Sequence, residues 1–183
     1  EIVLQGGGEM LNYVKNRTRE TRLSNVKIID KIVSREKVAK LLSEADTLLL
    51  PLKDFGRPYL GISSKLYEYQ AAGKPIICCA EGTPAEYIKE TESGIVVKPG
   101  DYEALARAIL YLKENREEAK RLGENGRRYI SENLAIEKIG DQMYKLLASI
   151  RCHKWFPSPK KRIAYSSYRL ANRKKGPWKV RTE

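Results

Sequence analysis

The sequence has 183 residues, which is enough for one domain with a hydrophobic core and an appendage. It holds no apolar run of the roughly 20 residues that span a bilayer, and its first residues lack the pattern of a secretory signal peptide. The net charge of +12 lies mainly in residues 151–183, which contain eleven Lys or Arg residues and one Glu. Positions 1–150 contain 24 basic and 22 acidic residues. The high pI therefore describes a basic tail and not the domain that precedes it.

Short apolar segments alternate with segments of helical periodicity along the first 150 residues. The apolar segments are typical of buried strands and lie at 2–5, 26–29, 47–51, 76–79 and 94–97. Helices are predicted over 10–21, 85–90, 116–133 and 135–149, and after three capping positions, Ser34, the pair Ser63-Ser64, and Asp101. This order predicts an α/β fold with a Rossmann-like parallel sheet covered by helices on both faces.

The three cysteines, Cys78, Cys79 and Cys152, show neither metal-binding nor redox spacing. Cys78 and Cys79 are neighbours in a predicted strand, where consecutive side chains point to opposite faces of the sheet. We therefore expect two core residues and no disulfide, in a reducing, cytoplasmic setting. His153 lies beside Cys152 without the further ligands that a metal site needs.

The sequence from residue 63 to 75 predicts a short helix with a capping signal at each end. Ser63 or Ser64 can cap its first amides, and Gly73 can close it in the left-handed conformation. The amides and the positive end of the helix dipole form a site for an anion such as phosphate, and Lys65 adds a cation. Glu68 lies one turn on from Ser64, about 6 Å along the axis, a spacing that suits a ribose hydroxyl. The alternative is a capped surface helix on which Lys65 and Glu68 form a weak ion pair.

Several loops are predicted to meet the start of this helix at one edge of the sheet. In parallel α/β sheets, ligands bind at the carboxyl ends of the strands. The glycine turn at residues 6–8, the loops after Ile29 and Pro51, and the segment after Cys79 all emerge there. The glycine turn alone is not a full dinucleotide motif and favours a tight strand-to-helix turn. Together, these features favour a nucleotide site.

The ordered motifs resemble those of the C-terminal, donor-binding domain of retaining glycosyltransferases with the GT-B fold, in family four (glycosyl transferases group 1). The resemblance covers roughly residues 1–150 and rests on segments 2–8, 45–51, 65–75, 82–86, 93–97 and 99–101. It implies a nucleotide-sugar-binding Rossmann-like domain at 1–150, followed by a basic aromatic tail at 151–183. It also implies that a first strand and an N-terminal acceptor domain precede this chain. Alone, the chain is expected to bind a donor weakly and to show no turnover.

The resemblance also implies roles for individual residues. It assigns the donor ribose to Glu68, and implies a UDP- or GDP-linked sugar with no required metal or cofactor. Leu60 stands where a family glutamate usually meets the donor sugar, so contacts to the sugar or phosphates are expected elsewhere. The implied diphosphate-binding residues are Ser63, Ser64, Lys65, Gly7 and Gly8; the base-binding loop is Lys31, Ile32 and Val33; and the candidate sugar or phosphate contacts are Lys53, Asp54 and Arg57.

The sequence is also compatible with other functions. The same fold could serve as a non-catalytic sugar-nucleotide-binding module or as half of an epimerase. In the tail, the basic runs 160–162 and 173–175 are interleaved with Trp155, Phe156, Tyr165, Tyr168 and Trp178. This composition suits an anionic membrane surface, giving a peripheral protein with a glycan or lipid-linked acceptor. A tail that docks on the acceptor domain or stays disordered is an equal alternative, and RNA binding ranks lower because no nucleic-acid-binding motif is present.

Overall fold

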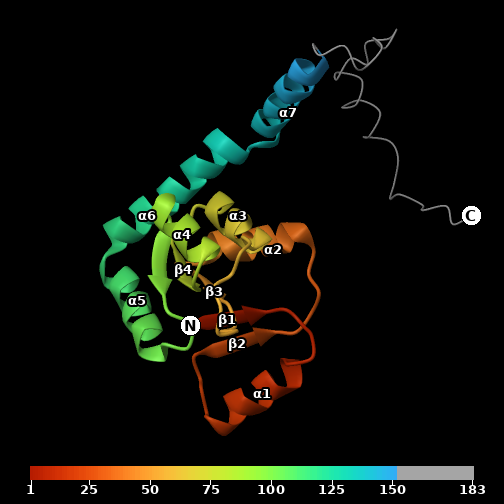
Figure 1. The fold of residues 1–183 in the computed structure, drawn as a ribbon. Coiled ribbons are helices and arrows are strands. Elements are labelled where there is room, and N and C mark those ends of the chain that lie inside the picture. The colour runs from red at the N-terminus through yellow and green to blue at the C-terminus, as the bar shows by residue number, and fades with distance from the viewer. Residues whose placement is uncertain (152–183) are drawn as a thin grey trace, which may run out of the picture. The chain divides into compact units, whose positions relative to one another are not determined.

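The computed structural model describes residues 1–151 (Figure 1). The chain divides into two units, Glu1–Lys138 and Ile139–Glu183, and the fold and site described below belong to the first. Residues 152–183 lie outside the described residues. The predictions for Cys152, His153 and the basic aromatic tail therefore stay predictions.

The strands and helices follow the predicted alternating order (Figure 1). In chain order they are β1 (Ile2–Gln5), α1 (Leu11–Glu20), β2 (Val26–Ile29), α2 (Arg35–Glu44), β3 (Leu48–Pro51), α3 (Ser64–Ala71), β4 (Ile76–Cys79), α4 (Thr83–Glu90), β5 (Gly94–Val97), α5 (Tyr102–Glu114), α6 (Arg116–Tyr129), a π-helical turn (Ile130–Leu134) and α7 (Ile136–Arg151).

The strands form two parallel sheets and not a single continuous one. β1 pairs with β2, and the larger sheet has the order β3-β4-β5. Among the described residues, no ladder joins β1 to β3, so each of these strands has one unpaired edge. The smaller sheet is also less covered, since Val3 is 46% exposed whereas Leu50 is 3% exposed. The α/β, Rossmann-like character of the fold is as predicted.

Two hydrophobic clusters lie on opposite faces of the larger sheet. Cys78 belongs to the cluster with Leu66 of α3 and Ile88 of α4, and Cys79 belongs to the cluster with Leu112 of α5. Alternating side chains of β4 thus feed both clusters, as the period of a strand requires. The prediction that both cysteines are core residues is confirmed, and both thiols are free and buried.

Several helix ends differ from the sequence prediction, among them one end each of α4 and α6. α4 begins at Thr83 and not at Ala85, because Gly82 turns the chain with φ of 78° and Pro84 stands in the first turn, where no amide is needed. α6 ends at Tyr129, and a π-helical turn replaces the predicted continuation to Asn133. Asn133 Nδ2 donates to the Tyr129 carbonyl oxygen at 3.0 Å, so this side chain competes for a backbone acceptor of the last turn.

Candidate functional site

The N-terminus of α3 is open. Ser63 is the N-cap residue in an extended conformation, but its side chain makes no capping hydrogen bond. The predicted serine cap is therefore wrong. The first turn closes instead through the backbone, where the Leu66 amide donates to the Ser63 carbonyl oxygen at 2.9 Å. Without a side-chain cap, the amides of the first turn are left for an acceptor from outside the helix.

The two faces of α3 have opposite characters. Leu66 and Gln70 are fully buried, whereas Ser64, Lys65 and Glu68 are exposed. The first turn contains no acidic residue, so Lys65 adds to the positive end of the helix dipole. Among the ion pairs of residues 1–151, none joins Lys65 to Glu68. The predicted alternative of a surface pair is therefore absent from this part of the chain.

The loop at residues 52–62 leads into α3 and is held by its own side chains. Asp54 Oδ1 accepts a hydrogen bond from the Gly56 amide at 2.7 Å, and the Tyr59 hydroxyl donates to the Lys53 carbonyl oxygen at 2.7 Å. The Lys53 ammonium lies 5.5 Å from the centre of the Phe55 ring. Lys53, Asp54 and Arg57 are all exposed, and Leu60 is 91% exposed. The loop thus presents both charged and apolar groups to solvent.

The same loop is fastened to the start of α4. The Tyr59 amide donates to the Glu81 carbonyl oxygen at 3.1 Å, and the Thr83 amide donates to the Tyr59 carbonyl oxygen at 2.9 Å. These bonds make an isolated parallel bridge between Tyr59 and Gly82. The segment after β4 and the loop after β3 therefore meet at the carboxyl edge of the larger sheet, as predicted.

The glycine turn and Lys31 meet at the carboxyl edge of the smaller sheet. The Gly6 amide donates to the Ile29 carbonyl oxygen at 3.1 Å, and Gln5 Nε2 donates to the Lys31 carbonyl oxygen at 3.4 Å. Gly7 and Gly8 are exposed, and a Cβ at either position would meet no atom within 4 Å.

The loop after β2 continues this edge. Lys31 is exposed and Ile32 is 101% exposed, whereas Val33 is half-buried. Lys15 pairs with Asp30, and its hydrogen bond and charge lower the pKa of that carboxyl. Since no ladder joins β1 to β3 in the described residues, the predicted site residues fall into two groups, each gathered on its own sheet.

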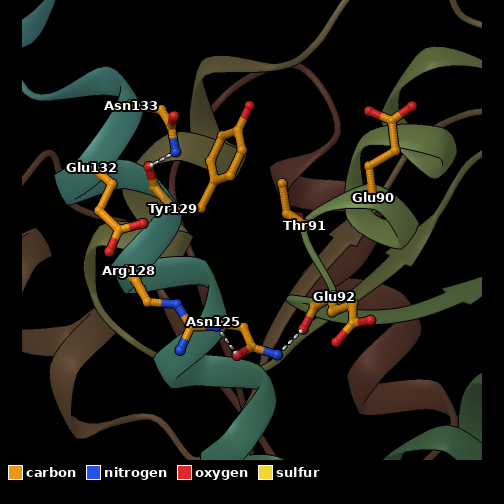
Figure 2. Close-up of a pocket in the computed structure, with 8 residues that line it drawn as sticks. All are labelled: Glu90, Thr91, Glu92, Asn125, Arg128, Tyr129, Glu132 and Asn133. Atoms are coloured by element: carbon orange, nitrogen blue, oxygen red, sulfur yellow. Dashed lines mark hydrogen bonds between the residues drawn. The ribbon is translucent and has the colours of Figure 1, made fainter.

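A shallow pocket of about 200 Å³ lies away from the predicted site residues (Figure 2). Thr91 and Glu92 lie in the short turn before β5, so the pocket lies at the amino edge of the sheet, opposite the loops described above. Figure 2 shows Asn125 bridging Arg128 and the backbone of Glu92 within it. It contains none of the predicted site residues, and no sequence motif indicates it. The pocket is lined by Glu90, Thr91, Glu92, Asn125, Arg128, Tyr129, Glu132 and Asn133.

Sequence reasoning also missed a buried polar group on α3. Gln70 is fully buried and hydrogen-bonded to Tyr87, Thr91 and Ser93. Its spacing of four from Leu66 could have indicated a buried face. The partners come from a later helix and turn, however, and no local pattern reveals such contacts.

No helix in the described part of the chain is long and apolar enough to cross a bilayer. Within residues 1–151, no group of three or more His, Cys, Asp or Glu side chains is arranged to hold a metal ion.

Comparison with known protein families gives one match across most of the described chain. The model of the family described as "Glycosyl transferases group 1" matches residues 1–129. O-antigen chain mannosyltransferase C from Escherichia coli is 28% identical over 150 residues, which cover 81% of this chain and 39% of the relative. D-rhamnosyltransferase WbpZ from Pseudomonas aeruginosa is 30% identical over 125 residues, which cover 68% of this chain and 32% of the relative. The chain thus spans well under half the length of these relatives.

Solved structures agree on the fold. HepE from Anabaena in complex with UDP matches with a TM-score of 0.66 at 22% identity, over 80% of this chain and 40% of that one. A sucrose-phosphate synthase from Thermosynechococcus elongatus matches with a TM-score of 0.67 at 26% identity, over 82% of this chain and 38% of that one. The parallel sheets and flanking helices are therefore shared with both of these solved structures.

Proposed function

We propose a donor-binding role for this chain, which belongs to the glycosyl transferases group 1 family because the family model matches well over half of its length. In the whole enzyme, this part holds a nucleotide-diphosphate sugar while the sugar is transferred, with retention of configuration, to an acceptor. The HepE structure was solved with UDP, which supports a nucleotide-linked donor here.

The observation that carries the proposal is the open N-terminus of α3. Ser63 does not cap it, and Ser64 and Lys65 are exposed beside it. A diphosphate placed there would accept hydrogen bonds from the first amides and a charge contact from Lys65. As the bond to the sugar breaks, the leaving diphosphate gains negative charge, and these fixed donors stabilise it. Such an arrangement would require no metal ion.

Glu68 follows on the exposed side of the same helix. With a diphosphate at the helix start, its carboxylate is placed to accept hydrogen bonds from the ribose hydroxyls. Hydrogen bonds to a charged group of this kind contribute about 1.5–3 kcal/mol. The proposal therefore assigns the ribose to Glu68.

The remaining donor contacts come from the two sheet edges. Gly7 and Gly8 let the backbone approach the diphosphate closely, because neither has a side chain and the space around them is open. The base would lie on the loop of Lys31, Ile32 and Val33. Lys53, Asp54 and Arg57 on the exposed loop are proposed to contact the sugar or the phosphates.

The residues assigned above contact the donor, and the acceptor site is proposed to lie outside them. The mannosyl- and rhamnosyltransferase names of two relatives support a hexose or deoxyhexose donor and a glycan or lipid-linked acceptor. We propose that a preceding strand pairs with the unpaired edges of β1 and β3, and that a preceding domain supplies the acceptor site. The basic tail at 151–183 is proposed to dock on that domain or on the cytoplasmic face of an anionic membrane.

The test is a titration of UDP, GDP and their sugar conjugates into the isotope-labelled chain, followed by NMR. We expect shifts to concentrate on residues 6–8, 31–33 and 63–68, and Glu68→Ala should weaken binding by about tenfold to a hundredfold. Glu103→Ala is the matched control, because Glu103 is an exposed carboxylate on α5 whose ion pair within residues 1–151 is with Arg107. No shifts at millimolar ligand, either here or in a longer chain with its preceding domain, would refute the proposal.

One observation favours a second candidate function. Leu60 is 91% exposed at the position where the family resemblance places a sugar-contacting glutamate. A non-catalytic sugar-nucleotide-binding module or an epimerase half would need no transferase contact there. Donor binding without transfer by the longer chain would favour a binding module, whereas isomerisation of the bound sugar would favour an epimerase.

A further inference from the structure

The buried carboxamide of Gln70 lies on the helix that carries the proposed donor site. α3 has only eight residues, a length of about 12 Å, and its buried residues are Leu66 and Gln70. A buried amide is costly unless it is hydrogen-bonded. Its partners therefore show what the helix is attached to.

Three hydrogen bonds engage the Gln70 side chain. Nε2 donates to Thr91 Oγ1 at 3.0 Å and to Ser93 Oγ at 2.9 Å. The Tyr87 hydroxyl donates to Oε1 at 2.8 Å. The carboxamide thus links α3 to α4, which carries Tyr87, and to the turn between α4 and β5, which carries Thr91 and Ser93.

One arrangement of protons satisfies all of these groups. The Thr91 hydroxyl donates to the Tyr87 carbonyl oxygen at 2.8 Å, so the Ser93 hydroxyl, 2.8 Å from Thr91 Oγ1, donates to Thr91. Both Nε2 protons of Gln70 are then used. Turning the amide over would leave the Tyr87 hydroxyl proton with no acceptor in this group. The network therefore fixes the orientation of the Gln70 side chain.

Packing encloses the network on its remaining sides. The Tyr87 ring meets the rings of Tyr67 and Tyr129 edge-on, with centroids 5.8 and 5.6 Å away. A Cβ at Gly126 of α6 would lie 3.0 Å from both Gln70 Cγ and Ser93 Cβ. These neighbours leave little space for the Gln70 side chain to adopt another rotamer.

The directional character of these bonds matters for α3. Apolar contacts such as that of Leu66 are non-directional and tolerate small rotations and shifts, whereas hydrogen bonds require both distance and angle. Of the two buried side chains of α3, Gln70 is therefore the one whose hydrogen bonds require a defined distance and angle between the helix and its neighbours. Ser64 and Glu68 move with that helix.

We propose that Gln70 is a positioning residue for the donor site, fixing α3 so that its open N-terminus and Glu68 meet the diphosphate and ribose together. Gln70 itself touches no donor atom. This proposal rests on the proposed function for the choice of ligand, but its structural part can be tested without one.

The test compares three variants of the full chain. Gln70→Leu replaces the carboxamide with an apolar side chain of similar size and removes the network, and Tyr87→Phe removes one hydroxyl and keeps the ring. Leu112→Ala is the matched control, because Leu112 is 1% exposed in the cluster on the opposite face of the sheet and is expected to lower stability without touching α3. Amide hydrogen exchange is measured for α3 and α5, and UDP affinity is measured by NMR.

Gln70→Leu should accelerate exchange of the α3 amides at least tenfold more than exchange of the α5 amides, and Tyr87→Phe should do so more weakly. Leu112→Ala should show the reverse pattern. Gln70→Leu should also weaken UDP binding about tenfold, while Leu112→Ala leaves affinity unchanged.

Two results would overturn the role of Gln70: equal loss of α3 protection in Gln70→Leu and Leu112→Ala, or unchanged UDP affinity despite loosened α3. If the unsubstituted chain and its longer form do not bind UDP or GDP, the proposed function fails. The exchange measurement then still decides whether Gln70 fixes α3.

Discussion

The carbonyl oxygen of Tyr59 lies 2.5 Å from the point where a side chain on residue 82 would place its Cβ atom. Gly82 also has φ of +78°, a conformation that L side chains rarely adopt. At this contact, the Tyr59 carbonyl oxygen accepts a hydrogen bond from the Thr83 amide. The attachment of the loop at residues 52–62 to α4 therefore depends on glycine at position 82.

Gly82→Ala should destabilise the chain by about 2–4 kcal/mol, because backbone strain adds to a clash with a backbone oxygen. Gly100→Ala is the control, since Gly100 has φ of +81° but no atom within 4 Å of its Cβ position, and it should cost only about 1–2 kcal/mol. Urea unfolding followed by circular dichroism gives both values. Equal losses would show that the loop moves aside at little cost.

A second glycine sets the spacing of the larger sheet. A Cβ at Gly94, the first residue of β5, would lie 1.9 Å from the Ile76 carbonyl oxygen of β4. Gly94→Ala must therefore push the two strands apart, and we expect a loss of at least about 2 kcal/mol, measured by urea unfolding. Gly140→Ala in α7 meets no atom within 4 Å and should leave the unfolding midpoint of the first unit unchanged. A tolerated Gly94→Ala would contradict the close contact.

The parts of the fold that sequence could predict are those set by local pattern. Apolar runs such as Leu48–Pro51 are buried strands because their side chains must leave water on both faces of a sheet. Ser34 and Asp101 cap α2 and α5, as predicted, because a side-chain oxygen can reach the amide three residues on within one turn.

What sequence missed depends on partners distant in the chain. Serine is a residue type that often caps helices, but the side chain of Ser63 makes no capping hydrogen bond. Glutamine is usually exposed on a helix. Only the fold brings Tyr87, Thr91 and Ser93 around Gln70. The division into two sheets is likewise a matter of strand pairing, which apolar periodicity does not encode.

The three N-cap positions, of which two make a capping hydrogen bond, give a graded prediction about stability. Asp101→Ala should cost about 1 kcal/mol, because Asp101 Oδ1 accepts the Ala104 amide at 2.8 Å. Ser34→Ala should cost about 0.5 kcal/mol, because its bond to the Lys37 amide is longer, at 3.4 Å. Ser63→Ala should cost close to nothing. Urea unfolding ranks the three, and a loss in Ser63→Ala equal to that in Asp101→Ala would mean that Ser63 caps α3 in solution.

The buried thiol of Cys78 predicts how stability depends on pH above neutrality. Burial, with a smaller effect from Cys79, raises the pKa of Cys78 to about 11 from an ordinary value of 9.0. Between these two values the unfolded chain releases this proton while the folded chain keeps it, so the folded state binds more protons and loses stability as pH rises. The contribution of Cys78 is complete below pH 9 and declines towards pH 11.

This prediction is best measured in a Cys152→Ser background, which removes the thiol outside the described residues. Urea unfolding at pH values from 7.5 to about 11 should show a steeper fall in stability than in the same chain carrying Cys78→Ala. In the native state at about pH 8, below the ordinary thiol pKa, a thiol reagent should modify Cys78 and Cys79 only after unfolding, because the thiolate is the reactive form. Rapid modification of the folded chain would show that β4 opens readily and that these thiols are not held in the core.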